Sequence, residues 1–233
     1  MHPVSRAFLG LSAVVILLLA ACQPVPTQRF ALGEVLQHVT FEADYEWENY
    51  ANAEQKVAFG VEDGEYHARA WDGGFTWAMN AELHTDVVIQ ADVRQLSEYT
   101  NNAFGLMCRA APTNNGNGYF FFISGDGTFT IRRGAASEVD YLIPWTHTNT
   151  IQQGRSINRL RIVCIEDYLA LYVNGQFVAE TRDSRYLQGY AGITAAVPEG
   201  GDVDVLFDDL TIWSASLIRA QDEAAAEPSS TAG

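Results

Sequence analysis

Apolar and polar residues alternate along most of the chain from Phe30 onward. A period of two is typical of a β-strand with one face on a core and the other in water. Thr85–Leu96 shows this pattern, with an apolar residue at every second position and polar residues such as Asp92 between them. Only Glu34–His38 suggests a turn of helix. The predicted strands are Val57–Val61, Glu65–Trp71, Phe75–Met79, Thr85–Leu96, Ala103–Ala110, Gly118–Ser124, Thr128–Arg133, Val139–Ile143, Asn158–Glu166, Tyr168–Val173, Gln176–Arg182, Tyr190–Ala196 and Val203–Trp213.

Three dipeptides mark tight turns between these strands: Asp63-Gly64, Asp126-Gly127 and Asn174-Gly175. Each accepts the positive φ that a two-residue hairpin loop requires, and each is flanked by β-branched or aromatic residues. Many strands at short spacing indicate a sandwich or a barrel. The fold class predicted is all-β, as a two-sheet antiparallel jelly-roll sandwich.

The N-terminal segment has a different pattern. Arg6 precedes an uncharged apolar run, Ala7–Ala21, which is shorter than the roughly 20 residues of a spanning helix. The run ends in Leu19-Ala20-Ala21-Cys22, which resembles the bacterial lipobox. That resemblance implies cleavage before Cys22, lipid on its thiol, and an exported protein anchored to a membrane at the cell surface or facing the periplasm. The alternative is an ordinary secretory signal followed by an unrelated cysteine.

Composition and charge limit the possible partners. Hydrophobic residues make up 48% of the chain, enough for a core, and the formal net charge is −15. Such a surface repels phosphate backbones, which argues against nucleic-acid binding. The predicted organisation is a signal peptide at 1–21, a tether at 22–29, one β-sandwich domain at 30–213, and a low-complexity tail at 214–233 whose end is disordered.

Two cysteines remain once Cys22 is assigned to lipid. Cys108 and Cys164 both fall on the apolar faces of their predicted strands. They are either two buried free thiols or a disulfide pair. Export favours the disulfide, which we predict.

Several segments occur in an order that resembles the concanavalin A-like lectin/glucanase superfamily. They are Gly105–Arg109, Gly118–Gly127, Asn158–Cys164, Leu171–Gly175, Gly189–Gly192 and Phe207–Leu210. The sequence is most similar to laminin-G-like and keto-disaccharide-hydrolase-like modules on bacterial surface lipoproteins, over roughly Phe41 to Trp213. The resemblance implies the sandwich fold, but this fold serves lectins, hydrolases and adhesion modules alike.

No catalytic residue is predicted. Glu42-Ala43-Asp44-Tyr45-Glu46 matches the Glu-x-Asp-x-Glu pattern of retaining glucanases, whose alternate spacing places nucleophile and acid/base on one strand face. Here the match precedes the domain's inner strands, so we interpret it as a solvated acidic edge. His67 has no partner set in the sequence, and no serine triad is indicated.

Calcium is the one cofactor considered. Jelly-roll lectins hold calcium in oxygen-rich loops, and the ion takes six to eight oxygen ligands. Two groups supply oxygen atoms here, although neither has a full calcium-loop spacing. The groups are Asp202, Asp204, Asp208 and Asp209 near the last strand, and Asn114, Asn115 and Asn117 in one loop.

The polar face of the sheet provides the candidate ligand site. If the strands are neighbours, one face carries arginines and aromatic rings, which suit sugar hydroxyls and sugar C–H faces respectively. The predicted ligand-binding residues are Trp71, Arg94, Arg109, Tyr119 and Arg161. The alternative is a solvated face with cross-strand ion pairs.

Three functions stay open at this point. The first is a non-catalytic surface lipoprotein that binds a glycan or another extracellular polymer, and this is the one we favour. The second is a structural or adhesion lipoprotein with protein partners. The third is a carbohydrate-active hydrolase of the same fold.

Overall fold

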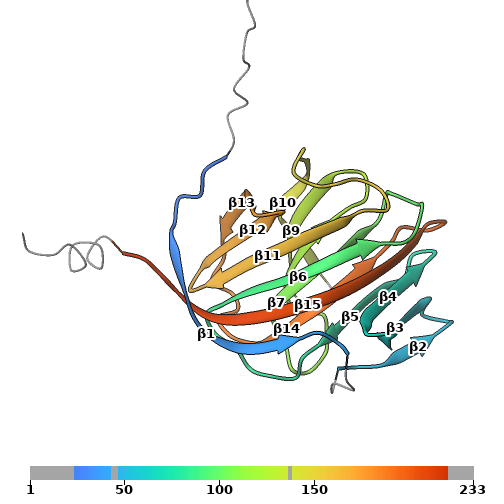
Figure 1. The fold of residues 1–233 in the computed structure, drawn as a ribbon, viewed down its shortest axis with the longest axis horizontal. Coiled ribbons are helices and arrows are strands. Elements are labelled where there is room, and N and C mark those ends of the chain that lie inside the picture. The colour runs from blue at the N-terminus through green and yellow to red at the C-terminus, as the bar shows by residue number, and fades with distance from the viewer. Residues whose placement is uncertain (1–23, 43–46, 136–137, 220–233) are drawn as a thin grey trace, which may run out of the picture.

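The computed structural model describes residues 24–42, 47–135 and 138–219 as two stacked antiparallel β-sheets (Figure 1). The strands are β1 (Phe30–Val39), β2 (Tyr50–Asn52), β3 (Val57–Glu62), β4 (Glu65–Trp71), β5 (Phe75–Met79), β6 (Val87–Gln95), β7 (Ala103–Ala110), β8 (Gly118–Ile123), β9 (Thr128–Ala135), β10 (Glu138–His147), β11 (Ile157–Ile165), β12 (Tyr168–Val173), β13 (Gln176–Arg182), β14 (Tyr190–Ala196) and β15 (Asp202–Leu217). The all-β sandwich is confirmed. No helix of the described residues is long and apolar enough to cross a membrane.

One sheet has nine strands and the other has six. The nine-stranded sheet runs β13-β12-β11-β6-β15-β4-β3-β2, with β1 beside β15. The six-stranded sheet runs β10-β9-β8-β7-β14-β5. β15 pairs with β4 over its first half, with β6 over most of its length and with β1 over its last part.

Every predicted strand overlaps one of β3–β15, and two corrections concern the ends of the domain. The expected turn of helix at Glu34–His38 is wrong, because these residues belong to β1, where Val35 pairs with Trp213. The predicted end at Trp213 is too early, because β15 continues to Leu217. Both errors concern the same pairing, which joins residues about 180 positions apart (217 − 30 = 187 for Phe30 and Leu217).

Two of the three predicted turns have the backbone that a type I′ hairpin needs. Asp63 and Gly64 have φ of 51° and 79°, and Asn174 and Gly175 have φ of 52° and 78°. Positive φ at both central residues matches the twist of the flanking strands. In Asp126-Gly127 only the glycine has positive φ.

The core lies between the two sheets, as the alternation predicts. The inward residues of β6, Val87, Ile89, Ala91 and Val93, are buried. Cys108 of β7 and Cys164 of β11 also point inward, and their sulfur atoms are bonded at 2.05 Å with Cα atoms 6.7 Å apart. The predicted disulfide is therefore confirmed, and it ties one sheet to the other.

The two ends of the described chain lie beside each other. The backbone N–H of Thr27 donates to the Glu180 carboxylate of β13 at 3.0 and 3.2 Å. The N–H of Ile218 donates to the carbonyl of Arg29 at 2.9 Å. Residues of the predicted tether are thus attached to the domain from Thr27 onward, whereas Cys22 and the predicted signal lie outside the described residues.

Candidate functional site

Three of the five predicted ligand-binding residues share the outer face of the nine-stranded sheet: Trp71, Arg94 and Arg161. Arg94 donates to Glu65 at 2.5 Å, and Arg161 donates to Gln90 at 2.7 and 3.0 Å. Both guanidinium groups are therefore already engaged, that of Arg161 with the adjacent strand β6 and that of Arg94, past β15, with β4. This arrangement matches the alternative interpretation, a solvated face with cross-strand pairs.

This outer face is hollowed near β11 and β12. A cavity of about 310 Å³ opens there, bounded by Gln90, Arg159, Arg161, Tyr172, Asn174 and Gly175. Arg159 adds a bidentate ion pair to Asp92, at 2.6 and 2.7 Å. Trp71 lies at the far end of β4 and does not line the cavity.

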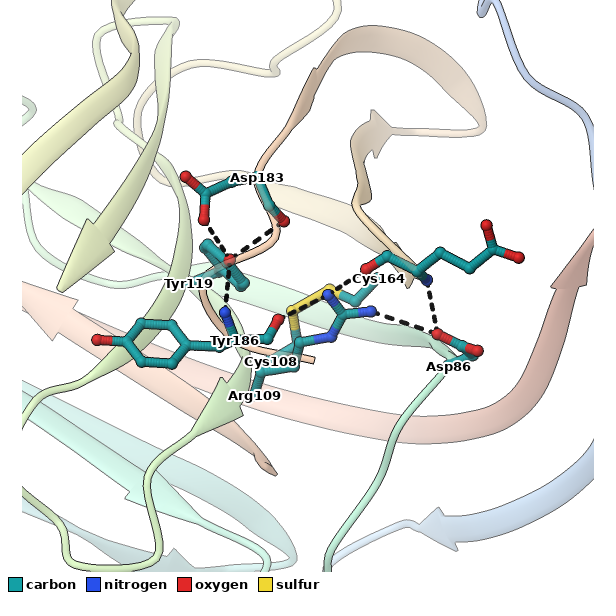
Figure 2. The surroundings of a disulfide bond; sticks show 8 residues. Asp86, Cys108, Arg109, Tyr119, Cys164, Asp183 and Tyr186 are labelled. Atoms are coloured by element: carbon teal, nitrogen blue, oxygen red, sulfur yellow. Dashed lines mark hydrogen bonds and ion pairs between the residues drawn. A yellow bond between two sulfur atoms is a disulfide. The ribbon is translucent and has the colours of Figure 1, made fainter. Parts of the chain in front are cut away.

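The other two predicted residues are inside the molecule, so their assignment to a surface site is wrong. The Arg109 side chain reaches the opposite sheet beside the disulfide (Figure 2). It donates to the carbonyls of Glu166 at 2.6 Å and Tyr186 at 2.9 Å, and pairs with Asp86 at 3.3 Å. Burial lowers the pKa of Arg109, and Asp86 opposes that shift.

A β-bulge explains the error at Arg109. This residue has a φ of 54°, and the register between β7 and β14 shifts between Tyr190 and Gly192. A bulge inserts an extra residue into one strand and turns the following side chains. Alternation counted along the sequence therefore assigns Arg109 to the wrong face.

Tyr119 is also buried. Its hydroxyl donates to Asp183 at 2.5 Å and accepts from the N–H of Tyr186 at 3.1 Å (Figure 2). Burial, together with the bond to Asp183, raises the pKa of Tyr119 to about 12. Tyr119 therefore supports the core at the same end of the sandwich as Arg109.

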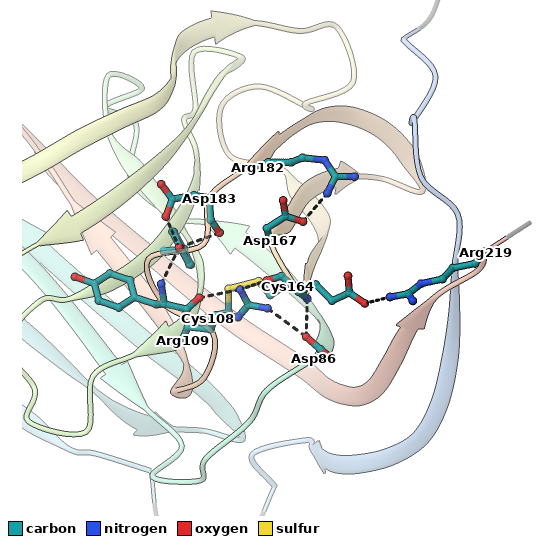
Figure 3. A network of polar contacts seen from close by, with 11 residues as sticks. Asp86, Cys108, Arg109, Cys164, Asp167, Arg182, Asp183 and Arg219 are labelled. Atoms are coloured by element: carbon teal, nitrogen blue, oxygen red, sulfur yellow. Dashed lines mark hydrogen bonds and ion pairs between the residues drawn. A yellow bond between two sulfur atoms is a disulfide. The ribbon is translucent and has the colours of Figure 1, made fainter.

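A polar network closes this end of the sandwich (Figure 3). Asp86 accepts the backbone N–H of Glu166 at 2.6 Å in addition to Arg109. The Glu166 carboxylate holds Arg219 at 2.6 Å, and Asp167 next to it holds Arg182 at 2.5 Å. These contacts link the connection after β11 to strands of both sheets, which is a structural role.

His67 has two partners that the sequence did not reveal. On the outer face of the nine-stranded sheet, its ring nitrogens lie 2.8 Å from Glu62 and 2.5 Å from Asp204. The bond to Asp204 raises the pKa of His67 more than burial lowers it, and the bond to His67 lowers the pKa of Glu62. Because both nitrogens bond to carboxylates, neither is left to activate a nucleophile.

The oxygen-rich groups considered for calcium are not gathered into one cluster. Asp202 and Asp208 are six residues apart on β15, roughly 20 Å along an extended strand. Asp208 accepts the N–H of Asp209 at 2.7 Å, and Asn114 accepts from the Trp77 indole. Among the described residues, no three His, Cys, Asp or Glu side chains are grouped to hold a metal ion. Calcium binding stays a prediction of the sequence.

A larger cleft lies where the edges of the two sheets meet. It has a volume of about 810 Å³ and lies between the β2–β3 hairpin and β5. Its walls combine aromatic rings with amide and carboxylate groups, the mixture typical of small-molecule and sugar sites. The residues that line it are Glu48, Asn49, Tyr50, Gln55, Val57, Phe59, Phe75, Thr76, Trp77 and Asn114.

Aromatic rings continue from this cleft across the outer face of the six-stranded sheet. We call this surface the aromatic face, and it consists of Phe75, Trp77, Phe120, Phe122, Arg132, Tyr141 and Trp145. Phe120 and Phe122 form a buried stacked pair, with ring centroids 5.9 Å apart at 5°. Phe75 lies 5.7 Å from Phe120 and also lines the cleft, so cleft and face share a wall.

Three rings of the aromatic face are more than a third exposed to solvent. Phe75 is 40% exposed, Tyr141 55% and Trp145 37%. The Arg132 guanidinium lies between the last two, 4.5 Å from the Tyr141 centroid and 5.1 Å from the Trp145 centroid. Burial lowers the pKa of Arg132. Exposed rings beside a charged planar group are the features that the sequence predicted for the ligand site, but they lie on the other sheet.

The sequence contains one signal of this face. Tyr119–Ile123 is apolar at every position, so both faces of β8 are apolar. A strand with one face in water would instead alternate apolar and polar residues. Tyr141 and Trp145 are harder to find. Two register shifts in β10, either side of Ile143, bring both rings to Arg132, and Trp145 lies beyond the predicted end of its strand.

Comparison with known proteins supports the fold. No protein-family model matches the sequence, and no characterised protein sequence matches it. Solved structures do match. A carbohydrate-binding module, CBM66 of Bacillus subtilis, superposes with a TM-score of 0.60 at 16% identity, covering 73% of this chain and 96% of the module.

Two further structures agree. A Bacillus subtilis protein of unknown function with a galectin-like fold gives a TM-score of 0.58 at 14% identity, covering 80% of this chain and 99% of that one. A Bacillus licheniformis β-glucanase gives 0.55 at 8% identity, covering 78% and 98%. Likeness at such identities shows the fold alone, and the two-sheet β-sandwich is the fold that the resemblance in the sequence implied.

Proposed function

We propose that this protein is an exported lipoprotein, anchored by lipid on Cys22, that binds carbohydrate on its aromatic face and does not cleave it. The observation that carries the proposal is the set of solvent-reaching rings, Phe75, Tyr141 and Trp145, on one sheet face beside the cleft. Aromatic rings stack on the C–H faces of sugars, and amide and guanidinium groups bond to their hydroxyls.

The solved structures favour the same class of ligand by analogy. One of them is a carbohydrate-binding module, and another is a β-glucanase. The fold alone hosts several functions, so the argument depends on the side chains of the aromatic face rather than on the likeness.

The cleft supports binding more than hydrolysis. Glycosidases place two carboxyl groups about 5–9.5 Å apart around the bond they cleave. Among the described residues that line the cleft, Glu48 is the only carboxylate, and it accepts the backbone N–H of Met79 at 3.1 Å. Glu42 does not line the cleft, and Asp44 and Glu46 of the glucanase-like pattern lie outside the described residues.

Two tryptophans provide a matched test. Trp145 on the aromatic face and Trp71 on the outer face of the nine-stranded sheet are both 37% exposed. Calorimetry of the full chain in detergent, against cell-wall and plant polysaccharides, should show weak binding. Loss of one stacking ring should cost about 1.4 kcal/mol, a roughly tenfold weaker affinity. We expect this loss in Trp145→Ala and not in Trp71→Ala.

The other outcomes are equally informative. Loss of binding in Trp71→Ala alone would move the site to the nine-stranded sheet, as the sequence analysis predicted. Release of reducing sugar that stops in Glu48→Gln would establish a hydrolase. Absence of binding across the whole panel would favour protein partners and an adhesion role.

A further inference from the structure

Arg132 is the cation at the centre of the aromatic face. Its guanidinium carbon lies 4.5 Å from the centroid of Tyr141, 5.1 Å from that of Trp145 and 5.4 Å from that of Phe122. Three rings at these distances attract the cation through their π-faces. They also replace much of the water that would otherwise solvate it.

The same guanidinium has no anionic partner among the described residues. Its Nε–H is buried and donates to no acceptor among the described residues, and no carboxylate of the described chain is paired with the group. Arg133, the next residue on β9, shows the contrast, because it holds Asp140 at 2.6 Å and also contacts Asp183. The chain has 29 acidic and 14 basic residues, so an arginine that is partly buried and pairs with no carboxylate stands out. Such a guanidinium can bind an acidic group that a ligand supplies.

Arg132 is only partly buried, so a ligand in solvent can reach it. Tyr141 and Trp145 flank the guanidinium and are among the most exposed rings of the protein, and Phe75 lies 6.3 Å from Phe122 on the side of the cleft. A sugar ring stacked on these side chains can therefore bring a substituent to Arg132. A planar carboxylate suits a guanidinium, because the two groups form parallel hydrogen bonds.

We infer that the aromatic face selects a glycan that carries a uronic acid, with Arg132 binding the sugar carboxylate. This inference rests on the proposed carbohydrate binding and names its ligand class. The net charge of −15 opposes the approach of a dense polyanion. Glycans with single carboxylates among neutral sugars therefore fit better than polymers with one on every sugar.

The test compares each acidic sugar with its own methyl ester. The full chain in detergent is screened at 0.15 M salt against uronic-acid-containing oligosaccharides and the corresponding methyl esters. The best pair is then titrated calorimetrically. We expect the acid to bind at least tenfold more tightly than its ester, since esterification removes the charge and keeps the stacking surface. Arg132→Gln should abolish that preference, and Arg132→Lys should keep part of it.

Arg94→Gln is the matched control, because Arg94 is an arginine of the opposite sheet that already holds Glu65. This variant should keep the full preference. Equal affinity of wild-type protein for acid and ester would overturn the inference and leave the proposed function intact. Binding of neither form, nor of any neutral glycan, would overturn both. If Arg132→Gln does not fold, the inference is still tested by the affinities of wild-type protein and of Arg132→Lys for the acid and for its methyl ester.

Discussion

Arg109 stabilises the sandwich from within. Arg109 is almost fully buried. Its side chain donates to the backbone carbonyls of Glu166 and Tyr186, which lie outside the strands. A buried acceptor without a donor costs about 1–3 kcal/mol. Since Arg109 starts on β7 and ends against the connection after β11, it joins the two sheets close to the disulfide.

This role predicts a large loss of stability in Arg109→Met. Removing the guanidinium leaves both carbonyls without this donor, which costs about 1–3 kcal/mol for each that is shielded from water, whereas the loss of the pair with Asp86 adds little because that carboxylate is 39% exposed. Arg94→Met should cost less than about 1 kcal/mol, because the Arg94–Glu65 pair is partly exposed. Urea unfolding of both variants measures the difference. Equal unfolding midpoints would contradict the structural role of Arg109.

His67 makes stability depend on pH in a defined direction. Its pKa is raised in the folded protein, mainly by Asp204. The charged pairing therefore contributes fully below the unfolded pKa of about 6.5 and is lost as pH rises through the folded pKa. At the acid end it is lost as pH falls through the lowered pKa of Glu62.

The prediction compares wild-type protein with His67→Gln by urea unfolding from pH 5.5 to 9. The stability difference should be greatest near pH 5.5, up to about 1 kcal/mol, and should shrink towards pH 9. Exposed His147 is the control, and His147→Gln should show no such trend. A difference that stays constant over the range would rule out the charged pairing.

Individual side chains could be predicted where the strand is regular and one face is apolar. The inward residues of β6 and β11, including Cys164, follow from alternation. Arg109 could not be placed, because a bulge depends on the pairing partner and not on the strand's own sequence. Arg132 was missed for another reason. Its three ring neighbours come from β8 and β10, and only the folded sheet brings them together.

β15 is the strand on which the nine-stranded sheet depends. It pairs with β6 on one side, and with β4 and then β1 on the other. Its last residues, Ala215 and Leu217, pack with Phe30 of β1 against an apolar cluster on the outer side of this sheet. Local pattern could not place the end of the strand, since Ser214–Leu217 is ordered by β1, which is distant in the chain.

A truncation series tests this end of the domain. A chain that stops at Trp213 loses the pairing of Phe30 with Leu217 and the apolar contact of Ala215 and Leu217. It should be less stable by about 1–2 kcal/mol. A chain that stops at Arg219 keeps these contacts and should be more stable than the chain that stops at Trp213 by that amount. Equal urea midpoints for the two truncated chains would show that the last part of β15 adds nothing.

Anchoring is the remaining property of the proposed lipoprotein, and it has a direct test. Cys22→Ser should abolish labelling by a radioactive fatty acid and should move the protein from the membrane fraction to the soluble fraction. The cause is chemical, because a hydroxyl does not replace the thiol that accepts the lipid. Cys108 and Cys164 are consumed in their disulfide, so they cannot substitute for Cys22. Unchanged labelling would refute the anchor.

The bond between Thr27 and Glu180 has a consequence for where such a protein can act. If Cys22 carries the lipid, as proposed, then residues 22–26 make up the chain between the anchor and Thr27, the first residue bonded to the domain. Five extended residues reach at most roughly 18 Å. A domain on so short a linker stays within a thin layer above its own membrane. It would meet polymers of the cell that made it at high effective concentration, and would rarely meet those of a neighbouring cell.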